Sequence, residues 1–164
     1  MEEFIDLPQP HEIDSSEKEK AMASYLMMFV NAGLGIPLPF INLVAAFIYY
    51  YALRKTSPFV YFHSFQSFLS QLPITIINGI AVVLGIRVIF FDAAFSDPFK
   101  GYLIAVALAN LVYIIFSVIA AVKAYQGKMY YFIFFGRIAY LDAFRKIDRE
   151  RNKKDEFINK PPEL

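Results

Sequence analysis

Cysteine and tryptophan are both absent from this 164-residue sequence, and histidine occurs only twice. The absence of cysteine excludes disulfides, thiolate metal sites and cysteine nucleophiles. With two histidines and no cysteine, the composition also argues against a transition-metal site, and we expect neither a metal nor a cofactor. The net charge is only +1, which gives a nucleic-acid partner no electrostatic support.

Charged residues are missing from three long stretches, Ala21–Leu53, Thr56–Ile86 and Gly101–Val122. The whole chain is 57% hydrophobic and 18% aromatic. A helix needs about 20 apolar residues to cross the hydrocarbon core of a bilayer, and each stretch is at least that long. The N-terminus, MEEFIDLPQPHEIDSSEKEK, is acidic and does not resemble a cleavable signal peptide. The sequence therefore predicts a single-domain, all-α polytopic membrane protein that keeps its N-terminus.

The first charge-free stretch is too long for one simple crossing and contains the segment NAGLGIPLP. Glycine and proline at this density break a helix. We expect helices over about residues 17–33 and 38–53, joined as a short hairpin or a re-entrant turn. The residues that make this break are Gly33, Gly35, Pro37 and Pro39.

Two long spans and an interfacial C-terminal helix complete the predicted four-helix bundle. Positive charge at Arg54, Lys55 and along the C-terminal tail places both termini on the cytoplasmic side. Three crossings with an external N-terminus are the alternative. The expected parts are a polar tail (1–16), a membrane helical domain (17–126), an interfacial amphipathic helix (127–150) and a charged tail (151–164). In the last two, basic residues either bind lipid headgroups or only fix the topology: Arg145, Lys146, Arg149 and Arg151.

The second charge-free stretch carries a stripe of polar side chains. At 100° per residue these side chains fall within an arc of about 140° on one helix face. Such a stripe either bonds to neighbouring helices, with Asn31, Asn42 and Asn110 as candidate partners, or lines a groove or a docking surface for another subunit. The stripe consists of His63, Gln66, Ser67, Ser70, Gln71 and Asn78.

Small residues recur at multiples of four along the third stretch, interrupted by Tyr113. Small residues at this spacing let two helix backbones approach closely, either within the chain or between two copies. The predicted packing face consists of Ala105, Ala109, Ser117 and Ala121.

A resemblance to a known family is carried by two segments, GIPLPFINLVAAFIYYYALRKTSPFVYFHSFQSFLSQ and YIIFSVIAAVKAYQGKMYYFIFFGRIA. Over about residues 20–140 the chain resembles small bacterial membrane proteins of unknown function, related to the twenty-kilodalton subunit of the chloroplast inner-envelope (Tic) import machinery. The distinctive residues are Pro37, Ser57-Pro58-Phe59-Val60, His63 and Ala124-x-x-Gly127-x-x-Tyr130. The resemblance implies four helices, both termini on one side, a location in the bacterial cytoplasmic membrane and a role in protein translocation.

Three classes of function follow from these observations. We expect a non-enzymatic subunit of a membrane assembly, associated with protein translocation, export or insertion, whose partners are lipids and other integral membrane proteins. The alternative is a self-contained channel or carrier for a small solute or ion, although the spans lack the charges that such a site needs. An enzyme is disfavoured and no catalytic residue is expected, because Ser64 and His63 point to different helix faces.

Overall fold

The backbone is helical and contains no strand over the part of the chain that the computed structural model describes, residues 7–30 and 40–144. In chain order the elements are helix α1 (Ser15–Leu26), the 3-10 turn η1 (Met27–Phe29), and helices α3 (Phe40–Leu53), α4 (Pro58–Phe90) and α5 (Asp97–Tyr125). Residues 135–144 form a further helical stretch. The predicted all-α class is confirmed.

Helix α4 begins at Pro58, two residues into the second charge-free stretch. The Ser57 side chain accepts a hydrogen bond of 3.3 Å from the Val60 N–H, and Pro58 occupies the first turn, where its missing N–H costs nothing. The helix then continues through Pro73, which removes one internal hydrogen bond. It ends at Phe90, four residues beyond the predicted run. The Arg87 carbonyl there accepts bonds from the N–H groups of Phe91 and Ala93.

Helix α5 ends in a Schellman motif built on Gly127. The Gly127 N–H bonds the Ala124 carbonyl and the Lys128 N–H bonds the Lys123 carbonyl, both at 2.9 Å. Gly127 has a φ of 73°, which glycine adopts without strain, and the Pro10 backbone and Lys18 side chain lie against it. This turn sends the chain back toward α4.

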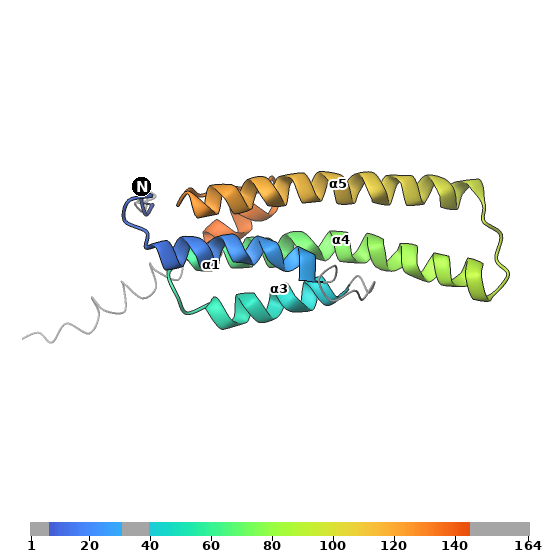
Figure 1. Ribbon diagram of the computed structural model, residues 1–164, viewed down its shortest axis with the longest axis horizontal. Helices are drawn as coiled ribbons and strands as arrows, with labels where there is room; N and C mark the ends of the chain where they lie inside the picture. The colour runs from blue at the N-terminus through green and yellow to red at the C-terminus, as the bar shows by residue number, and fades with distance from the viewer. Residues whose placement is uncertain (1–6, 31–39, 145–164) are drawn as a thin grey trace, which may run out of the picture.

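Two helical pairs of unequal length make up the molecule (Figure 1). Helices α4 and α5 form a long antiparallel hairpin, and α1 and α3 lie antiparallel beside one half of it. The expected return of the first stretch to its starting side is therefore visible in the direction of α1 and α3. The predicted break residues Gly33, Gly35, Pro37 and Pro39 lie outside the described residues.

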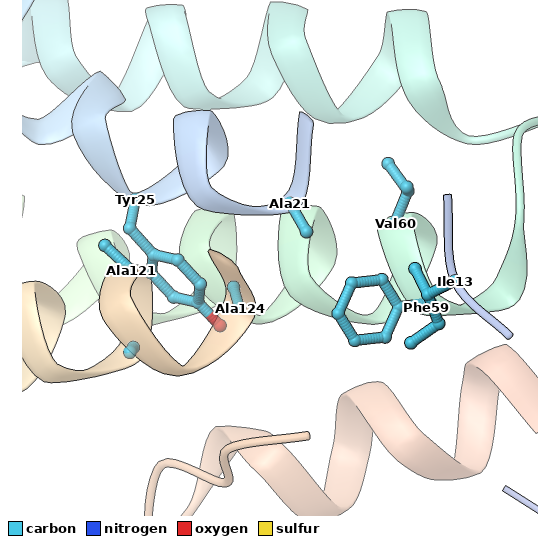
Figure 2. Packing of buried hydrophobic residues seen from close by; sticks show 8 residues of the cluster. Ile13, Ala21, Tyr25, Phe59, Val60, Ala121 and Ala124 are labelled. Carbon is cyan, nitrogen blue, oxygen red and sulfur yellow. The ribbon is translucent and has the colours of Figure 1, made fainter. Parts of the chain in front are cut away.

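The main core lies where α1 meets the first turns of α4 and the last turns of α5 (Figure 2). Tyr25 and Ala21 of α1 pack there against Phe59 of α4 and Ala124 of α5. Ile13 is only 5% exposed and belongs to the same cluster, although it lies in the predicted polar tail. The packed unit thus starts a few residues before the expected boundary at residue 17.

The C-terminal segment differs from the continuous interfacial helix predicted over residues 127–150. Residues 128–132 are not helical, residues 133–134 form a turn, and helix resumes at 135. The physical reason is that Gly127 ends α5 and that main-chain groups of the next residues bond a side chain of α4, as described below. A second cluster, including Phe62 of α4 with Ala139, Ala143 and Phe144, packs the returning helical stretch.

Candidate functional site

The polar stripe of α4 faces the interior of the protein. His63 and Gln66 are fully buried, and Ser67, Ser70 and Gln71 are at most 4% exposed. Asn78, one turn beyond Pro73 on the same helix, is half-buried. The structure therefore brings the first five predicted residues into one buried region and places Asn78 apart from them, toward the middle of the α4–α5 hairpin.

Tyr25 of α1 is the centre of this buried region. Its hydroxyl lies 2.9 Å from His63 Nδ1 and accepts a hydrogen bond of 2.8 Å from Gln66 Nε2. A phenol can accept one hydrogen bond and donate another, so the Tyr25 hydroxyl can bond the Gln66 amide and the His63 ring at the same time. The Lys128 backbone lies beside the His63 ring. Within the described residues, no acceptor meets Nε2 in hydrogen-bond geometry.

Gln66 ties the C-terminal segment to α4. Its Nε2 donates to the Tyr130 carbonyl at 2.9 Å, and its Oε1 accepts from the Phe132 N–H at 3.2 Å. The segment then turns sharply, with the Gly136 N–H bonded to the Phe132 carbonyl. A methyl group on Gly136 would lie 2.7 Å from Tyr131 Cα and 2.8 Å from Gln66 Oε1, so only glycine fits this turn.

A second attachment holds the far end of the same segment. The Tyr61 hydroxyl of α4 donates to the Asp142 carboxylate, and the Tyr50 hydroxyl of α3 lies 3.2 Å from the Tyr61 hydroxyl. Residues 128–144 are thus bonded to α4 at both ends, by Gln66 and by Tyr61.

The remaining polar side chains make shorter-range bonds. Ser67 Oγ donates to the Ser24 carbonyl of α1 at 2.7 Å, and Ser70 Oγ donates to the Ser67 carbonyl at 2.8 Å. Farther along, the side-chain amides of Asn78 and Asn110 bond each other reciprocally at 3.0 and 2.7 Å. Of the three predicted partners of the stripe, Asn110 is therefore bonded to it, whereas Asn42 bonds the Met28 carbonyl and Asn31 lies outside the described residues.

Gln71 contrasts with Gln66 on the same helix. It is 2% exposed, yet neither atom of its side-chain amide has a hydrogen-bond partner within the described residues. The Ser117 hydroxyl of α5 is likewise buried and unbonded there. A buried amide without partners costs free energy, so Gln71 does not hold the described helices together.

The predicted small-residue face of α5 is divided by the structure. Ser117 and Ala121 are buried where α5 meets α1, Ala109 is half-buried, and Ala105 is exposed. The close contact is completed by Ala120 and Ala124, which sequence reasoning did not include in that face. The predicted headgroup residues Arg145, Lys146, Arg149 and Arg151 lie outside the described residues.

Sequence reasoning missed Tyr25, Tyr130, Gly136 and the Tyr61–Asp142 pair as parts of the site. Tyrosine in an apolar run is typical of a membrane interface, so Tyr25 was not expected in a buried site. Every residue has a main-chain carbonyl, so the sequence cannot indicate that the Tyr130 carbonyl accepts a hydrogen bond. One signal was available for Gly136, since a glycine among aromatic residues indicates close approach of two chain segments.

The described residues of this site include few groups that could bind a metal ion or take part in a reaction. No group of three or more histidine, cysteine, aspartate or glutamate side chains that could hold a metal ion occurs among residues 7–30 and 40–144. Its one histidine is fully buried and bonded to a tyrosine. The arrangement joins α1, α4 and residues 128–136 through hydrogen bonds between neutral groups.

Comparison with known proteins gives one family match. The pattern of the magnetosome magnetite crystal formation protein family matches residues 16–139. These residues include α1, α3, α4, α5 and most of the segment that Gln66 holds. No curated protein and no solved structure matches the chain.

The match overturns the functional expectation. The resemblance to a relative of the chloroplast import subunit is wrong, and with it the expected role in protein translocation, because the matching family is described by magnetite crystal formation. The alternative of a solute channel or carrier has no support from that family either. The expected translocation role came from the family resemblance, and the inward polar stripe could not correct it, because such a stripe joins the helices of any membrane bundle and is not specific to a translocon. The family match extends over most of the 164 residues, and the chain belongs to the magnetosome magnetite crystal formation protein family.

Proposed function

We propose that this protein is an integral membrane protein that acts, without catalysing a reaction, in the formation of magnetite crystals. The match of residues 16–139 to the family described by that process carries the proposal. The proposed membrane placement is supported by the length of the helices, the composition of their surface and the position of the charges.

Length supports two complete crossings. Helix α4 has 33 residues and α5 has 29, which correspond to about 50 Å and about 44 Å. A bilayer has a hydrocarbon core of about 30 Å and measures about 40–45 Å with its headgroups. Both helices are also apolar enough to cross, and none of the most apolar window of α4 is buried inside the protein.

Charged residues mark both ends of these helices. At the start of α4, Arg54 stacks on the Tyr51 ring with its guanidinium carbon 3.9 Å from the ring centroid. At the other end, Lys100 bonds Asp97 at 2.8 Å, and Arg87 is exposed. Tyrosine and basic side chains are typical of the two membrane interfaces. We place the end with Arg54 and both termini on the cytoplasmic side.

In this proposal the pair of helices α1 and α3, and the segment of residues 128–144, both enter the membrane from the side that carries Arg54. Helices α1 and α3 have 12 and 14 residues, about 18 Å and 21 Å, so neither described helix crosses alone. The exposed face of α3 is apolar, with Val44, Phe47 and Ile48 all more than 45% exposed. Residues 128–144 form the second such element, with Ile133 and Phe134 at its tip 83% and 76% exposed.

A non-catalytic role fits the buried site. A reaction centre needs access for a substrate, whereas His63 and Gln66 are fully buried by α1, α4 and the C-terminal segment. We propose that lipids are the partners of the exposed apolar surface. Other integral membrane proteins are a second class of partner, which isolation in mild detergent would detect.

Deletion of the gene in its native host tests the function. We expect magnetite crystals that differ in size, number or shape from those of the parent when measured by electron microscopy. Expression of the intact chain restores them, and a chain carrying Gln66→Leu restores them less well because the C-terminal segment loses its attachment. Crystals identical with and without the gene would contradict the proposal. Extraction of the protein from membranes by alkaline carbonate would contradict its membrane placement alone.

A further inference from the structure

Burial along α4 is confined to one end of the helix. Every buried residue of α4 lies between Phe59 and Gln71. Beyond Pro73 the helix shows Ile76, Val83 and Ile89 at 61%, 59% and 72% exposure. The opposing residues of α5 behave likewise, with Ile104 and Leu108 exposed by 63% and 58%.

The packed end is wide because three elements surround it. Helices α1 and α3 and the segment 128–144 all lie against the half of α4 that carries the buried residues (Figure 1). In the other half, α4 and α5 are the described elements that remain, joined by the Asn78–Asn110 pair and by the Tyr102 hydroxyl, which donates to the Ile77 carbonyl. Within the described residues, the protein therefore has a much larger cross-section at the end where α1 begins and α5 ends, here called the wide end, than at the α4–α5 turn.

Both halves present apolar side chains to their surroundings. At the wide end these include Val44 and Ile48 of α3 and Ile133 and Phe134 of the C-terminal turn. The extra elements therefore displace acyl chains in one leaflet and do not simply rest in the headgroups. If the membrane placement proposed above holds, the protein occupies more area in the leaflet that surrounds its wide end than in the opposite leaflet.

We infer that the protein is wedge-shaped within the bilayer and binds preferentially to strongly curved membrane, with the leaflet around its wide end on the convex surface. A convex leaflet has excess area at the level of its headgroups and outer acyl chains, and the wide end of the protein fills that area. The same protein in the reverse orientation would fill area in the concave leaflet, where area is scarce. The partner is a curved lipid surface, and no particular headgroup is required.

Orientation-resolved sorting between vesicles tests the inference. The intact chain has no cysteine, so one cysteine added at the N-terminus gives a single labelling position. The labelled protein is reconstituted at low density into small sonicated and large extruded vesicles of one zwitterionic lipid, and a membrane-impermeant quencher separates outward from inward termini. We expect protein with outward termini to be several-fold denser on the small vesicles, and protein with inward termini to show the reverse.

Equal densities on both vesicle sizes in both orientations would overturn the inference while leaving the membrane placement intact. Failure to float with either vesicle would instead refute the membrane placement on which the inference rests. These two outcomes are distinguished in the same flotation experiment.

A variant narrows the wide end without touching the core. Ile133→Asp combined with Phe134→Asp places charge on two side chains that are mostly exposed, which expels the tip of the C-terminal turn from hydrocarbon. We expect a smaller density ratio between the vesicle sizes, whereas the matched control Ile133→Leu with Phe134→Leu keeps the full ratio. An unchanged ratio in the aspartate variant would overturn the assignment of the preference to the wide end.

Discussion

The two halves of α4 differ in how their side chains are buried and hydrogen-bonded. The first half carries His63, Gln66 and Ser67, and these side chains are buried and bonded to α1 or to residues 130–132. The second half carries isoleucine and valine that face outward, and two side-chain contacts join it to α5, the Asn78–Asn110 pair and the Tyr102 hydroxyl, which donates to the Ile77 carbonyl. In the membrane placement proposed above, apolar side chains gain little by leaving lipid for protein, so hydrogen bonds between polar groups favour assembly of the helices at the first half of α4.

The sharpest test of this contrast compares two buried glutamines on one helix. Gln66→Leu leaves the Tyr130 carbonyl, the Phe132 N–H and the Tyr25 hydroxyl without the amide, and we expect a loss of about 3 kcal/mol. Gln71→Leu removes an amide that has no partner in the described part of the chain, so stability is unchanged or increased. Thermal unfolding in detergent, followed by circular dichroism, measures both. Equal losses would mean that burial alone matters, and not bonding.

Glycine substitutions extend the contrast to packing. Gly136→Ala forces a methyl group against the Tyr131 backbone, and we expect a loss of about 2 kcal/mol. Gly79→Ala, in the outward-facing half of α4, meets no atom within 4 Å and should be neutral or slightly stabilising. Trypsin cleavage after Arg137 should also become faster in the Gly136 variant only. Normal cleavage there would show that the turn tolerates a side chain.

Tyr25→Phe isolates the hydroxyl at the centre of the buried site. The ring and its packing stay, but His63 Nδ1 and Gln66 Nε2 each lose a partner, and we expect a loss of about 1.5 kcal/mol. The matched control is Tyr125→Phe on α5, where the ring is 55% exposed. A midpoint shift no larger than that of the control would contradict the central position of Tyr25.

The smallest effect is expected in the hairpin itself. Asn78→Leu should cost about 0.6–1.7 kcal/mol, because one amide of the reciprocal pair loses its partner. The double variant Asn78→Leu with Asn110→Leu should recover part of that loss, since no unpaired amide remains. A double-mutant cycle without coupling between the two positions would show that the pair does not join α4 to α5.

Much of the fold follows from the sequence because it depends on local signals. Long charge-free runs predict α4 and α5, Ser57-Pro58 predicts where α4 begins, and helical periodicity predicts that the stripe lies on one face. The partners of the stripe could not be predicted in the same way. Gln66 bonds main-chain atoms of residues 130 and 132, and such atoms are identical in every residue.

The conformation of the C-terminal segment could not be predicted either, because it depends on the same main-chain hydrogen bonds to Gln66. The aromatic run after Lys128 has the composition of an interfacial helix, but Gly127 ends α5 just before it and Gln66 bonds the main chain of residues 130 and 132, so residues 128–132 are not helical. The function could not be predicted from the polar pattern of the sequence, for a different reason. Hydrogen bonds that assemble a bundle are the same whichever process the bundle serves, so the polar stripe could not test the translocation role that the family resemblance implied, and the family match is to magnetite crystal formation.

The attachment of residues 130–132 to Gln66 has a consequence for biosynthesis. Chains are made from the N-terminus, so α4 leaves the ribosome well before its C-terminal partner exists. If the membrane placement proposed above holds, the Gln66 amide lacks two of its three hydrogen bonds until residues 130–132 emerge, in a medium that offers no replacement. A nascent chain interrupted after α5 would therefore carry an unsatisfied amide into the lipid, and completion of translation is what closes the bundle.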